Sequence, residues 1–102
     1  MTYHVSMLER QSKVYLTKRA DKELTKAPNA VKDSFQDWVT GVEMVGLREM
    51  RKIPGLHDEP LKGDRKGQRS VRLSGKWRAI YTENETKQLT VVTVEEVTPH
   101  AY

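Results

Sequence analysis

LKGDRKGQRSVRLSGKWRAIY, residues Leu61 to Tyr81, joins a glycine-containing basic loop to two short patterns typical of strands. Val71 and Leu73 alternate with Arg72, which predicts a strand that buries one face and turns the arginine to the other. The dipeptide Gly75-Lys76 favours a tight hairpin turn, after which the chain pairs back. This stretch therefore predicts an antiparallel hairpin that carries arginines.

Positive charge is concentrated around this hairpin. Between Arg48 and Arg78 there are ten Lys/Arg against four Asp/Glu, a local net charge of about +6. Because the whole chain carries +4, the remainder nets about −2. Such a patch suits a polyanion, since phosphate contacts dominate nucleic-acid affinity.

Length and composition limit the class of protein. With 102 residues, 36% hydrophobic and 31% charged, we expect one globular domain over residues 1–102, with 1–12 as an N-terminal arm. No apolar run approaches the roughly 18 residues of a membrane span, and no signal-peptide pattern is present. We therefore expect a cytoplasmic protein without membrane contact.

Cysteine and histidine usage limits the chemistry. The absence of cysteine excludes disulfides, thiolate zinc sites and cysteine nucleophiles. His4, His57 and His100 show no metal-ligand spacing. We expect neither a metal nor another cofactor.

The first half of the chain reads as one strand and two helices. Lys13 to Leu16 is a β-prone run suited to an edge strand. Thr17 can cap a helix, which Pro28 ends while also suiting the first turn of the next helix. That second helix ends at Gly46. Its apolar stripe contains Val31, Phe35, Trp38, Val39, Val42 and Val45, and we expect the two aromatic residues in the core.

The second half reads as a loop and three strands. The loop Leu56 to Gly67 precedes the arginine hairpin, a turn is expected over Asn84 to Lys87, and the last strand runs from Gln88 to Val97. That strand is apolar on both faces, which favours an interior position in the sheet. The fold class is α+β: a small antiparallel sheet of about four strands, with an N-terminal helical hairpin packed on one face.

The string LHDEPLKGDRKGQRSVRLSGKWRAIY, followed by a last strand and VTPHAY, resembles the RelE/HigB family of type II toxin–antitoxin ribonucleases. The resemblance covers about residues 13 to 102. It implies a RelE-like fold, cleavage of messenger RNA in the ribosomal A site without a metal, and inhibition by a cognate antitoxin protein. Operator DNA would be a partner only through the toxin–antitoxin complex.

The resemblance also implies catalytic residues. Carried over onto this chain, they are Arg78, Arg72, His100 and Tyr102. Metal-free RNA cleavage needs a group that takes a proton from the 2′-hydroxyl, one that gives a proton to the leaving oxygen, and cations for the phosphorane. Arginines suit the phosphate, and an imidazole exchanges protons near neutral pH. Tyr102 could act as base, orient the nucleophile or stack on a nucleobase.

Six further residues are candidates for contact with RNA or the ribosome: His57, Lys62, Arg65, Lys66, Arg69 and Lys76. The alternative is that these residues are solvated charges or, for His57, a packing residue.

Two other functions fit the same sequence. A ParE-like toxin of the same fold would bind DNA gyrase instead of cutting RNA. A non-catalytic RNA-binding module would need the basic patch alone.

Overall fold

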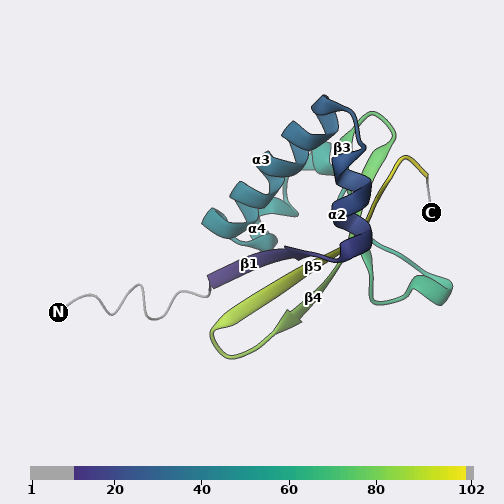
Figure 1. Cartoon of the computed structure of the whole chain (residues 1–102). Coiled ribbons are helices and arrows are strands. Elements are labelled where there is room, and N and C mark those ends of the chain that lie inside the picture. The colour runs from purple at the N-terminus through teal and green to yellow at the C-terminus, as the bar shows by residue number, and fades with distance from the viewer. Residues whose placement is uncertain (1–10, 101–102) are drawn as a thin grey trace.

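A computed structural model describes residues 11–100, which form a five-stranded sheet with the helices packed on one face (Figure 1). The strands are β1 (Gln11–Leu16), β2 (Glu59–Pro60), β3 (Arg69–Ser74), β4 (Trp77–Glu85) and β5 (Leu89–Thr98). The helices are α2 (Lys18–Thr25), α3 (Asn29–Val45) and α4 (Leu47–Met50), with 3-10 turns η1 (Pro54–Leu56) and η2 (Gly63–Arg65). Across the sheet the order is β1-β5-β4-β3-β2.

The α+β class is confirmed, as are the antiparallel hairpin of β3 and β4 and the interior position of β5. The expected count of about four strands was one too low, because β2 adds a short edge strand to β3. The sheet is also mixed, since β1 pairs with β5 in parallel.

Two boundaries differ from the expectation. Gln11 and Ser12 belong to β1, although they were expected in the N-terminal arm; residues 1–10 of that arm lie outside the described residues. β4 continues to Glu85, because its last residues pair with the start of β5 and the turn is closed at Thr86. The amide of Thr86 donates to the carbonyl of Leu89 at 2.8 Å.

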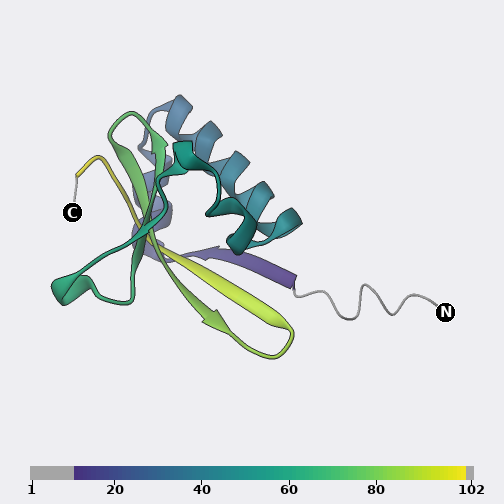
Figure 2. The ribbon, with the colours of Figure 1, turned by 180° about the vertical axis from the view of Figure 1, so that it is seen from behind.

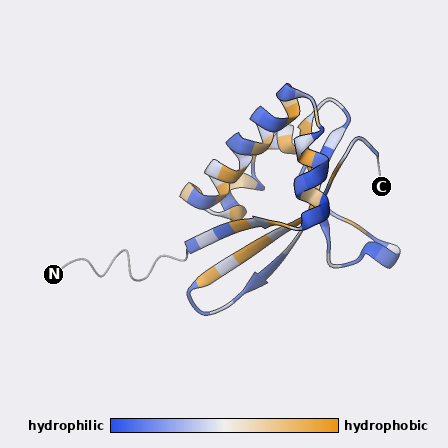
Figure 3. Ribbon diagram, viewed as in Figure 1, coloured by the Kyte–Doolittle hydropathy of each residue, from blue (hydrophilic) through white to orange (hydrophobic). Residues whose placement is uncertain are grey.

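The long helix α3 supplies most of the core that covers the sheet. Its buried residues include Phe35 and Trp38, 5% and 1% exposed, which confirms their predicted core position. The ring of Trp38 lies 5.3 Å from that of Tyr81 on β4. Figure 3 shows the hydrophobic positions of α3 facing the sheet and hydrophilic ones facing outward. Among residues 11–100, no helix combines the length and apolar character needed to cross a membrane.

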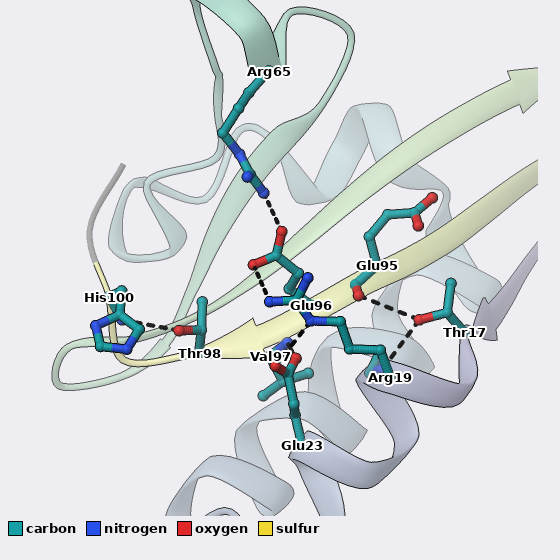
Figure 4. Close-up of polar contacts among 10 residues, drawn as sticks. Thr17, Arg19, Glu23, Arg65, Glu95, Glu96, Val97, Thr98 and His100 are labelled. Carbon is teal, nitrogen blue, oxygen red and sulfur yellow. Dashed lines mark hydrogen bonds and ion pairs between the residues drawn. The ribbon is translucent and has the colours of Figure 1, made fainter.

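Helix α2 takes the place of β1 along the last residues of β5. β1 ends at Leu16, and beyond it the Thr17 hydroxyl donates to the carbonyl of Glu95 at 3.2 Å. The amide of Val97 donates to Glu23 Oε1 at 2.8 Å (Figure 4). These bonds satisfy backbone groups that would otherwise lack a strand partner, and they fix the end of β5.

Thr17→Ala should destabilise the fold, because the Thr17 hydroxyl both caps α2 by accepting from the Ala20 amide at 3.0 Å and binds β5. We expect a loss of about 1–2 kcal/mol, measured by urea denaturation. Thr25→Ala is the matched control, since Thr25 occupies an exposed position of the same helix and its hydroxyl donates to the carbonyl of Asp21 at 2.8 Å. Equal losses in both variants would contradict this role.

Candidate nucleic-acid interface

Strands β3 and β4 each carry an arginine on the face of the sheet opposite the helices. Val71, Ala79 and Tyr81 belong to the core under the helices. Because strand side chains alternate, Arg72 on β3 and Arg78 on β4 turn to the opposite side, which we call the open face. Figure 2 shows the segment that carries η2 projecting on the side of the sheet away from α3.

A β-bulge places the end of β5 on this open face. Tyr81 pairs with Val94 but Ile80 pairs with Glu96, so Glu95 is an extra residue on β5. The alternation shifts by one, and Val97 enters the core while Glu96 and Thr98 turn to the open face.

The register forms a row of polar residues across three strands. Arg72 is the direct cross-strand partner of Arg78, and Arg78 is the direct partner of Thr98. Cα atoms of such partners lie about 4.5–5.5 Å apart, and like charges directly opposite each other destabilise a sheet. Among residues 11–100, neither arginine has a carboxylate partner. This row can therefore bind an anion that offsets the repulsion.

Orphaned polar atoms on the same face support an anion or hydrogen-bonding ligand. The Nε of Arg78 is buried without a hydrogen-bond partner in the described part of the chain, and so are Ser70 Oγ and Gln68 Oε1. Ser70 lies on β3 two residues before Arg72 and therefore on the same face. Buried polar groups are normally paired, so this cluster fits a ligand site.

His100 lies next to the row because of Thr98. The His100 amide donates to Thr98 Oγ1 at 3.1 Å, and Figure 4 shows the imidazole beside that threonine. The His100 side chain is exposed. Arg72 and Arg78 thus lie side by side on the open face, and the backbone of His100 is bound to Thr98, which belongs to the same face. Tyr102, the fourth expected catalytic residue, lies outside the described residues.

Arg69 is separated from this row. It lies on the helix side of β3, as the direct partner of Tyr81, and its Nε donates to Asp58 Oδ1 at 2.7 Å. The hydroxyl of Tyr81 donates to the other oxygen of Asp58, whose side chain is 1% exposed, and Arg51 Nε lies 3.8 Å from Asp58 Oδ1. Asp58 thus binds the segment before β2 to the sheet through hydrogen bonds and ion pairs, and Arg69 supplies one of these contacts.

The other candidates for RNA contact lie in three places. Lys62 and Lys66 are exposed at the two ends of η2, where the neighbouring Gly63 and Gly67 have φ of +65° and +100°. Arg65, between them, forms an ion pair with Glu96. Lys76 is exposed in the turn between β3 and β4.

His57 is exposed, with a left-handed φ of +45°, and directly precedes Asp58. The cationic patch expected from the sequence is thus divided between the two faces of the sheet.

Sequence reasoning missed Asp58, Glu96 and Thr98. The signal for Glu96 was present, because Glu95-Glu96 interrupts an otherwise apolar strand and a strict alternation from Val92 and Val94 would bury Glu96 in the core. Asp58 gave no comparable local signal, since it pairs with residues distant in sequence. Among residues 11–100, no three His, Cys, Asp or Glu side chains are grouped so as to hold a metal ion.

Comparison with known proteins identifies the fold. No family model and no curated protein matches this sequence. Solved structures do match it. In the toxin–antitoxin complex RelBE2 from Mycobacterium tuberculosis, a chain is 21% identical with a TM-score of 0.65, over 91% of this chain and 95% of that one.

Two further structures agree. In the archaeal RelE–RelB complex from Pyrococcus horikoshii OT3, a chain is 22% identical with a TM-score of 0.64, over 87% and 94% of the two chains. A YoeB/ParE toxin from Agrobacterium tumefaciens is 19% identical with a TM-score of 0.62, over 87% and 99%. The chain therefore has the fold of RelE-like toxins, as the resemblance in sequence implied.

Arg69→Ala and Arg72→Ala should affect the free energy of unfolding differently, because residues three positions apart on one strand lie on opposite faces of the sheet. Arg69→Ala leaves the buried Asp58 carboxylate with a weaker set of partners and should cost about 2–3 kcal/mol of unfolding free energy. Arg72→Ala removes an exposed like-charge neighbour of Arg78 and should leave stability within about 0.5 kcal/mol or raise it. Urea denaturation measures both; a larger loss for Arg72→Ala would reverse the assignment of faces.

Tyr81 should limit stability at alkaline pH. Burial raises the pKa of its phenol well above the ordinary value, and the hydrogen bond to Asp58 raises it further. A raised pKa in the folded state means that the stabilisation is fully present below about pH 10 and is lost as pH rises toward the folded-state pKa. Tyr81→Phe should be less stable than the wild type at neutral pH but lose less stability between pH ~9 and pH ~11. Parallel losses of both proteins over that range would count against this coupling.

Proposed function

We propose that this chain is the toxin of a type II toxin–antitoxin pair, an endoribonuclease that cleaves messenger RNA in the ribosomal A site. The observation that carries the proposal is the row on the open face. Arg72 and Arg78 lie directly opposite each other without a carboxylate among residues 11–100, and His100 is held next to them through Thr98.

The residues of the row can perform the cleavage. The 2′-hydroxyl attacks the adjacent phosphorus, the bond to the 5′-oxygen breaks, and a cyclic phosphate and a free 5′-hydroxyl result. Arg78 and Arg72 bind the non-bridging oxygens and offset the charge that grows in the transition state. His100 transfers one of the two protons involved. Tyr102, which lies outside the described residues, is the candidate to act as base, to orient the nucleophile or to stack on a nucleobase.

The partners follow from the fold and from charge. The M. tuberculosis and P. horikoshii chains of the same fold are found in complexes with antitoxins. For this chain we assign an antitoxin partner that covers the open face or blocks access to the ribosome, with operator DNA bound only by the joint complex. Exposed Lys62 and Lys66 would contact RNA backbone, which lysines bind without reading sequence.

A gyrase-directed toxin is the competing function, since one structure of this fold is a YoeB/ParE toxin. Gyrase binding needs a complementary protein surface, whereas it gives no reason for two arginines to oppose each other beside a histidine. The arginine row therefore favours RNA cleavage.

Primer extension on translating ribosomes tests the proposal. The wild type should produce discrete cuts in the message, while Arg78→Ala and His100→Ala should each reduce the cleavage rate by roughly 100-fold or more, because each removes a group that acts on the reacting phosphate. Arg48→Ala is the matched control, since it removes an equal charge from an exposed position on α4. Cleavage that survives Arg78→Ala, or intact messages together with inhibited supercoiling by gyrase, would refute the nuclease.

A further inference from the structure

The segment between β2 and β3 is attached to the open face through a buried carboxylate. Arg65 of η2 forms an ion pair with Glu96 on β5, and Glu96 is only 4% exposed (Figure 4). Glu96 pairs with Ile80, two positions along the strands from the Arg78–Thr98 pair. Ile80 is fully buried although it lies on the open face.

The segment between β2 and β3 is loosely packed near the Arg65–Glu96 ion pair. A hollow of about 550 Å³ is lined by Glu59, Pro60, Leu61, Lys62 and Arg65. Dense apolar packing therefore does not fix the segment, although Leu61 is buried. A charged hydrogen bond at a buried site contributes more than a neutral one. The ion pair with Glu96 is therefore the contact that attaches η2 to β5.

Glu96 also connects the segment to the helix that fixes the end of β5. Its second oxygen accepts from Arg19 Nη2 at 3.3 Å, and Arg19 Nε donates to Glu23 Oε2 at 3.2 Å. Glu23 in turn accepts from the amide of Val97, three residues before His100. Figure 4 shows this chain of contacts running from η2 across β5 to α2.

We propose that Glu96 is a positioning residue for RNA: it binds Arg65 and thereby holds Lys62 and Lys66 at the edge of the arginine row. This inference rests on the proposed function. Arg65 then acts as an anchor for the segment, whereas the sequence suggested direct contact with RNA. The two arginines on Glu96 neutralise its charge, so that it does not repel a phosphate at the row.

Glu96→Gln is the decisive substitution, because the amide keeps the size of the side chain but replaces one acceptor oxygen by a donor that faces an arginine. The segment should loosen. Amide hydrogen exchange should speed up by roughly tenfold or more at Arg65, Lys66 and Gln68, whose amides bond within the segment at 3.0–3.2 Å. In cleavage of ribosome-bound message, KM should rise by roughly tenfold while kcat stays within about twofold.

Glu95→Gln is the matched control, since Glu95 is adjacent in sequence and its side-chain carboxylate accepts from the Thr82 hydroxyl at 3.3 Å. It should leave exchange in the segment and KM unchanged. Arg65→Gln breaks the same ion pair from the other side and should loosen the segment equally, even if Glu96→Gln fails to fold.

The two proposals fail separately. Exchange in the segment that is unaltered in both Arg65→Gln and Glu96→Gln would overturn the positioning role, as would a KM that stays constant or falls. Absence of cleavage by the wild type would overturn the proposed function and leave the exchange experiment to test the attachment alone.

Discussion

The extra residue at Glu95 is the constraint on which the arrangement of the open face depends. With an unbroken register from the Tyr81–Val94 pair, Glu96 would oppose Ala79 and enter the core, and Val97 would turn away from it. The bulge reverses both, at the cost of a local break in the ladder. It places Thr98 opposite Arg78, so that the exit of the chain toward His100 begins on the same face as the two arginines.

Ion pairing, more than charge count, distinguishes the arginines of this protein. Arg51 and Arg69 lie at the buried carboxylate of Asp58, and Arg19 and Arg65 lie at Glu96. These pairs hold segments in place. Arg72 and Arg78 have no such carboxylate in the described part of the chain, although Asp58 and Glu96 are buried in the same protein. A protein that needed only solubility would not set two arginines against each other in this way.

Local patterns predicted what depends on neighbours in sequence. The β3–β4 hairpin, the cap at Thr17, the end of α3 at Gly46 and the burial of Trp38 all follow from side-chain periodicity or turn chemistry. Pairing between distant segments escaped prediction: the parallel partner of β1, the addition of β2 and the bulge in β5. Contacts between distant residues also determine the site, and they were not predicted. Arginines at 65 and 69 read alike in the sequence, but Glu96 and Asp58 hold them on opposite faces.

The central claim is that a phosphodiester occupies the space between Arg72 and Arg78. Nitrogen-15 NMR of the arginine side chains tests it directly, during titration with an RNA oligonucleotide whose 2′-hydroxyls are methylated to prevent cleavage. The account predicts that the guanidinium resonances of Arg72 and Arg78 shift together, while those of Arg51 and Arg69 stay in place. Shifts confined to Arg51 and Arg69, or an unchanged Arg78, would contradict it.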